Sequence, residues 1–202
     1  MKSMPKSVFA DNTMIIKGSN LMGASTYLKI GAVDFQLSIS DNDRFISKTE
    51  IKFKLDPDKP DFNDLKIGIQ SLSIVHPLLL GKPLVEHKGF VSKSISIKLH
   101  PLIKSHSIIG DLINVEIFPR IKPGQKCYII LTEIMDPNST EKGREGITEF
   151  TDSIDEASLG NMYFIDRPEN IKNEGKEYLV RVKIDNLMSQ TSEDLKAPSL
   201  VI

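Results

Sequence analysis

The sequence predicts a single domain built mainly from β-strands, arranged as an antiparallel β-sandwich or a jelly-roll-like fold. Three observations carry this prediction: apolar and polar residues alternate with period two in several segments, turn residues separate these segments, and helical patterns are scarce. The chain has 202 residues, of which 40% are hydrophobic and only 6% aromatic. A chain of this length can bury an aliphatic core without disulfides.

The alternation is clearest in four segments. Val33, Phe35 and Leu37 alternate with polar residues in the first of them, residues 33–39. The same pattern recurs in residues 51–55, 95–99 and 178–184. Each segment is predicted to bury one face and to expose the other, as is typical of antiparallel sheets packed on one side.

Other segments are predicted to be more deeply buried strands. They cover residues 27–30, 65–75, 112–117 and 127–131. The last of them, Cys-Tyr-Ile-Ile-Leu, is apolar over nearly its whole length and is predicted to be a central strand. The pairs His76-Pro77 and His100-Pro101 are predicted to end the strands before them, because proline has no N–H to donate to a ladder.

Turns, one short helix and a tail complete the prediction. Asp, Asn, Pro and Gly cluster in residues 41–43, 56–58 and 122–124, which predicts turns there. Among one or two short helices, the best supported covers residues 153–159, with Asp152 as a possible N-cap and Gly160 behind it.

Two segments are predicted to be mobile. Residues 136–146 and 189–202 carry too little apolar surface to offset the entropy of ordering them. No linker separates two halves of the chain. We therefore predict one domain over residues 1–188 and a flexible tail over residues 189–202.

The charge is unevenly distributed. The net charge is −1, but residues 1–100 carry +4 and residues 101–202 carry −5. Five lysines stand between Lys82 and Lys104 with Glu86 as the one acidic residue among them. A basic end of this kind binds polyanions, although solvated strand faces give the same pattern. The candidate nucleic-acid-binding residues are Lys52, Lys54, Lys82, Lys88, Lys93, Lys98 and Lys104.

Catalytic and metal sites are not predicted. The phosphate loop, the dinucleotide fingerprint, the nucleophile elbow and the HExxH zinc motif are all missing from the sequence. Cys127 stands in an apolar strand, where a small buried side chain is the usual role. The four histidines have irregular spacing and no thiolate beside them, so the sequence predicts no metal and no cofactor. We expect a protein that is not an enzyme.

The compartment is inferred from cysteine usage and hydropathy. A single cysteine favours a reducing compartment. The most apolar stretch, residues 74–85, is shorter than a membrane span and is interrupted by two prolines, a glycine and a lysine. We expect no transmembrane segment, no signal peptide and an intracellular location.

Residues 109–164 resemble the plant virus movement proteins of the thirty-kilodalton superfamily. The resemblance rests on the hydrophobic strand 112–118 before Pro119, the Pro123-Gly124 loop, and the second strand 127–133, in which Leu131 precedes Glu133. Glu133 stands where the family has aspartate. Residues 155–163 are also similar to a stretch that follows the motif in tobamovirus members, although an insertion separates the two parts.

The resemblance implies cell-to-cell transport of a viral genome through plasmodesmata. It implies binding of single-stranded nucleic acid without sequence preference, self-association into homo-oligomers, and contact with viral nucleocapsid or host membrane and cell-junction proteins. The location would then be the host cytoplasm, plasmodesmata or the membrane periphery. Leu131, Glu133, Gly124 and Pro119 would be structural residues, with Glu133 at the end of a central strand.

A second hypothesis comes from the β-rich pattern itself. Exposed sheet edges serve as interfaces in proteins that assemble. A viral matrix or coat-type structural protein that acts by self-assembly is therefore the alternative function.

Overall fold

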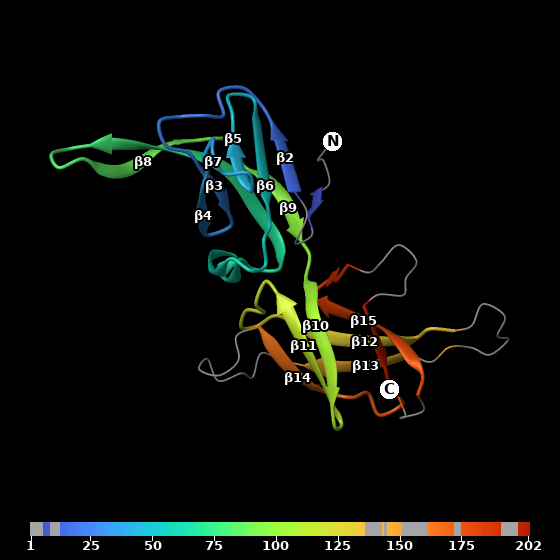
Figure 1. The fold of residues 1–202 in the computed structure, drawn as a ribbon. Helices are drawn as coiled ribbons and strands as arrows, with labels where there is room; N and C mark the ends of the chain where they lie inside the picture. Colours follow the sequence, from blue (N-terminus) through green and yellow to red (C-terminus); the bar gives the residue numbers. More distant parts are fainter. Residues whose placement is uncertain are drawn as a thin grey trace. The chain divides into compact units, whose positions relative to one another are not determined.

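The computed structural model describes residues 6–8, 13–135, 143, 145–150, 161–171, 175–190 and 198–202. The described part is mainly β, with several antiparallel sheets and one short 3-10 helix, which confirms the predicted fold class. The chain forms two compact units, Met1–Leu99 and His100–Ile202. Figure 1 shows the sheets of each unit.

The division into two units differs from the predicted single domain over residues 1–188. Each unit has its own pair of sheets and its own buried residues. The boundary lacks the composition of a linker, because one strand ends at Leu99 and the next begins at Leu102. The change of net charge near residue 100 is the one sequence signal that coincides with it.

The described residues of the first unit form nine strands and the 3-10 helix. One sheet has the order β1-β9-β7-β3-β4, with β8 paired to β7, and the other has the order β2-β6-β5. Named strand pairs are antiparallel except β1 with β9. The elements are β1 (Lys6–Val8), β2 (Thr13–Lys17), β3 (Tyr27–Ile30), β4 (Val33–Gln36), β5 (Arg44–Ile46), β6 (Glu50–Lys54), η1 (Pro60–Asp64), β7 (Gly68–Leu80), β8 (Val85–Val91) and β9 (Ile95–Leu99).

Three phenylalanines join the two sheets of the first unit. Phe35 on β4 stacks on Phe62 of η1 at 4.9 Å between ring centroids, and Phe53 on β6 lies 5.1 Å from Phe35. All three side chains are fully buried. Such pairs contribute about 0.5–1.5 kcal/mol beyond their buried area. This cluster therefore fixes η1 against both sheets.

In the second unit, the residues that the structure describes form eight strands in two sheets. Their orders are β10-β11-β14 and β13-β12-β15-β16, with β17 also paired to β15. The strands are β10 (Leu102–Ile109), β11 (Leu112–Phe118), β12 (Cys127–Glu133), β13 (Glu145–Phe150), β14 (Met162–Asp166), β15 (Glu177–Ile184), β16 (Leu187–Met188) and β17 (Ser199–Val201).

Tyr163 anchors the core of the second unit. It lies on β14 and is 2% exposed, and its ring is 6.0 Å from that of Phe150 on β13 in the other sheet. The Tyr163 hydroxyl accepts a hydrogen bond of 3.0 Å from the backbone N–H of Ile121. Tyrosine thus supplies apolar area and satisfies a buried donor in the same place.

Most predicted strands are present, with small differences at their ends. The strands over residues 27–30 and 95–99 have the predicted bounds, and β12 lies between β13 and β15, as predicted for a central strand. The predicted end of the strand at Pro77 is wrong. β7 continues through Pro77 to Leu80, because a register shift between His76 and Leu78 accommodates the proline.

The predicted tail is wrong in its last residues. Ser199–Val201 forms β17 on β15, and Leu200 and Ile202 are buried. The predicted helix over residues 153–159 lies outside the described residues. The predicted mobile segment 136–146 lies largely outside them, but its last two residues belong to β13.

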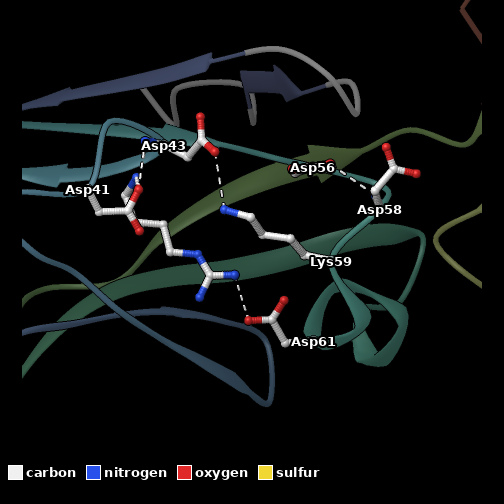
Figure 2. Close-up of polar contacts among 7 residues, drawn as sticks. Asp41, Asp43, Asp56, Asp58, Lys59 and Asp61 are labelled. Carbon is white, nitrogen blue, oxygen red and sulfur yellow. Dashed lines mark hydrogen bonds and ion pairs between the residues drawn. The ribbon is translucent and has the colours of Figure 1, made fainter.

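Charged residues of two turns brace the first unit around η1. Asp41 accepts hydrogen bonds from the backbone N–H groups of Asp43 at 2.8 Å and Arg44 at 3.1 Å. Arg44 in turn donates to Asp61 of η1 at 2.6 Å, and Lys59 lies 3.2 Å from Asp43. Figure 2 shows Lys59, in the loop before η1, directed at the Asp43 carboxylate. The turn predicted over residues 41–43 is therefore closed by its first side chain.

The pKa of Asp41 reflects this arrangement. Burial raises the pKa of the carboxyl, but the two backbone hydrogen bonds and the charges of Lys59 and Arg44 outweigh it and hold the pKa below its ordinary value of 3.8. Because the pKa of Asp41 is lowered in the folded state, its ionised carboxylate stabilises the fold at pH values above the ordinary pKa. That contribution is lost as the pH falls through the lower, folded-state pKa.

We expect Asp41→Asn to lower the free energy of unfolding at neutral pH and to lose this effect in acid. Asparagine keeps an oxygen acceptor for the turn but lacks the charge. Urea unfolding from pH 7 down to pH 2 should show the two proteins converging below about pH 4. Asp64→Asn, at an exposed position on η1, is the matched control. A stability gap that stays constant down to pH 2 would contradict this account.

Candidate functional site

The most unusual feature of the first unit is the far half of the hairpin formed by β7 and β8. β3 pairs with β7 only as far as Val75, opposite Tyr27, and β9 pairs with β7 between Gly68 and Leu72. Within the described part of the chain, residues 76–90 pair only with each other. We call these residues the arm. Figure 1 shows the arm extending beyond the other strands of its unit.

The base of the arm is built by a bulge and a close backbone approach. Pro77 lies at the register shift, where residues 88 and 89 of β8 oppose this one residue of β7. A Cβ atom at residue 89 would stand 2.1 Å from the carbonyl oxygen of His76, so only glycine fits there. His76 itself is held from the sheet side, with Nδ1 at 3.1 Å from the Thr26 hydroxyl. The hydroxyl of Ser92 accepts a hydrogen bond from Ile74 N–H at 2.9 Å just before the arm begins.

The arm exposes apolar side chains over its whole length. Six of the sixteen exposed large apolar residues in the described part of the chain belong to these fifteen positions. Leu84 is 68% exposed and Phe90 is 73% exposed. The six are Leu78, Leu79, Leu80, Leu84, Val85 and Phe90.

A groove of about 840 Å³ lies between the arm and the outer face of its sheet. Apolar atoms of Val75, Pro77 and Val91 contribute to its lining. Its polar side chains come from β3, β4 and β8. Lys29 and Asp34 form an ion pair at 3.1 Å, and the Tyr27 hydroxyl donates to the Glu86 carboxylate at 3.3 Å. The groove is therefore apolar with a net negative rim.

The predicted basic residues are distributed over several elements of both units. Lys52 lies 3.5 Å from Glu50 on β6, and Lys104 lies 3.6 Å from Glu116 in the second unit. Lys54 follows Lys52 on the same strand of the smaller sheet. Lys82 lies at the arm tip, Lys93 between β8 and β9, and Lys98 on β9; the side chain of Lys88 lies outside the described part.

The four motif residues occupy structural positions in the second unit. Leu131 is fully buried in β12, and Glu133 ends that strand with its side chain 6% exposed and 2.6 Å from Lys176 Nζ. Gly124 has a φ of +82° in the loop before β12. Pro119 follows β11 directly.

The structure also places the one cysteine and the possible metal ligands. Cys127 is buried in β12. Among the described residues, no group of three or more His, Cys, Asp or Glu side chains is placed to hold a metal ion. In the same residues, no helix has the length and apolarity needed to cross a membrane.

The arm was not predicted from the sequence, although the apolar run that forms it is visible there. Residues 74–85 form the most apolar stretch, and the strand predicted over residues 65–75 was expected to end at Pro77. The unusual feature is a run of leucines after a proline, followed by Gly81-Lys82-Pro83 as a turn.

Comparisons with known proteins identify no family for this chain. No family model matches it, and a search of the curated proteins finds none that is significantly similar.

We expect Gly89→Ala to loosen the arm without unfolding the unit. The added methyl group would collide with backbone atoms of His76 and Leu78, which cannot rotate away as a side chain can. The free energy of local opening should fall by about 1–3 kcal/mol. Amide hydrogen exchange in residues 78–87 is the measurement, and Ser94→Ala, between β8 and β9, is the control. Unchanged exchange in the arm would show that the close approach does not hold it.

Proposed function

We propose that the protein is a non-enzymatic structural protein that acts by self-assembly, with the arm as its attachment element. The observation that carries this proposal is a two-stranded hairpin with open edges and exposed leucines. An isolated hairpin is marginally stable in water. Monomeric proteins rarely expose a contiguous apolar patch unless it binds something.

The exposure of consecutive leucines supports the same conclusion. Neighbouring residues of a strand point to opposite faces, so Leu78, Leu79 and Leu80 place apolar groups on both faces of the arm. An ordinary half-buried strand would have one polar face. An arm of this kind fits between two surfaces or beside another strand, which is how strand-addition interfaces form.

The movement-protein function stays a prediction from the resemblance. Two of its candidate lysines are paired with carboxylates, and the set is divided between the two units. The first unit carries a net charge of +4. Its exposed lysines are the observation that supports nucleic-acid binding.

For that hypothesis we expect single-stranded RNA binding that weakens steeply with salt. Changing Lys88, Lys93 and Lys98 together to Glu should flatten the slope of log affinity against log salt concentration, because fewer counterions are released. Fluorescence anisotropy at several salt concentrations measures this slope. A folded protein that binds no RNA at low salt would exclude the hypothesis.

If the protein acts by self-assembly, we expect the double variant Leu79→Asp/Leu84→Asp to self-associate more weakly than the wild type. Burying a leucine is worth about 1.5–3 kcal/mol, so losing two should raise the dissociation constant at least about 100-fold. Sedimentation velocity over a concentration series measures the mass. Thermal unfolding at concentrations too low for association should be unchanged, because both side chains are exposed in the monomer.

Ile39→Asp is the matched control. Ile39 is 70% exposed and lies in the same unit, outside the arm. The Ile39→Asp substitution should leave the dissociation constant of self-association unchanged. A wild-type protein that stays monomeric at every concentration would refute assembly as the function, and equal effects of the two variants would refute the arm as its site.

A further inference from the structure

We propose that the groove beside the arm receives the arm tip of a second copy, so that two chains exchange arms reciprocally. This inference deepens the proposed function and rests on it, because it names the partner and the receiving site. The arm tip is defined as residues 80–84, Leu-Gly-Lys-Pro-Leu.

The tip and the groove are complementary in character. The tip presents Leu80 and Leu84, both more than half exposed, and the groove contains apolar atoms of Val75, Pro77 and Val91. A groove of about 840 Å³ is in the range, about 300–1,000 Å³, that holds a ligand of drug size. It therefore has room for the apolar side chains of a short turn.

The charges of the tip and the groove are complementary as well. Lys82 is exposed at the tip, and no carboxylate of the described residues lies within ion-pair distance of it. The groove holds two carboxylates, of which Asp34 is already bridged by Lys29. Among the described side chains, Glu86 receives only the Tyr27 hydroxyl, which is neutral. An incoming lysine would therefore supply a cation for Glu86.

The position of the groove favours a reciprocal contact. The arm carries the tip at its end and contributes Glu86, His87 and Gly89 to the lining of the groove along its side. A second arm that enters this groove must run beside the first one. When two arms lie side by side and antiparallel, each tip meets the other chain's groove, so the same pair of surfaces is used twice. This is the isologous arrangement of a two-fold dimer.

The test uses charge reversals at the tip and in the groove of the full chain. Lys82→Glu and Glu86→Lys should each weaken association about tenfold, because each puts like charges together at both contacts of the dimer. An equimolar mixture of the two variants should associate as the wild type does. In the mixed dimer one contact is native and the other is reversed but still complementary. Lys48→Glu, at an exposed position outside the arm, controls for the change in net charge.

The outcomes separate this inference from the proposed function. Rescue on mixing, measured by sedimentation velocity, is the expected result. If the single variants associate like the wild type, or if mixing restores nothing, the exchange of arms is refuted, while assembly through Leu79 and Leu84 stands. A monomeric wild type would refute both. If that monomer instead binds vesicles of equal parts phosphatidylcholine and phosphatidylserine through Leu79 and Leu84, the arm contacts a membrane and not a second copy.

Discussion

The pairing of β7 determines both the larger sheet of the first unit and the candidate site on that sheet. Its first half is held between β9 and β3, whereas its second half has β8 as its one partner. The bulge at Pro77 keeps the strand continuous across this change, and Gly89 allows the backbones to approach there. One ladder of hydrogen bonds therefore places the arm, supports the groove and joins both to the larger sheet of the first unit.

The fold class followed from the sequence because strand periodicity is a local property. Residues 27–30 and 95–99 became strands with the predicted bounds, and the apolar run at Cys127 became a central strand. Turn chemistry was equally local, since the side chain of Asp41 closes its own turn. What could not be predicted is how the strands combine into sheets. The period-two pattern of a strand says which of its faces is buried, but it does not name the distant strand with which it pairs.

The second compact unit and the arm were missed for different physical reasons. β9 and β10 follow each other with only two residues between them, so the boundary has no flexible composition. The arm has the composition of a core strand, and only its missing neighbours distinguish it. Proline was interpreted as a stop at Pro77, but a proline at an open edge costs little because no ladder partner needs its N–H. The second stop, at Pro101, does follow the end of β9.

Pro77 and Pro83 also affect how the chain behaves before it binds a partner. Segments that stack into cross-β fibrils are about six or seven residues long, apolar and free of proline. Pro77 and Pro83 leave five residues between them, and these include Gly81 and Lys82. Residues of this kind act as gatekeepers around unavoidable apolar strands. The arm can thus remain exposed in newly made protein without offering an uninterrupted segment that would seed a fibril.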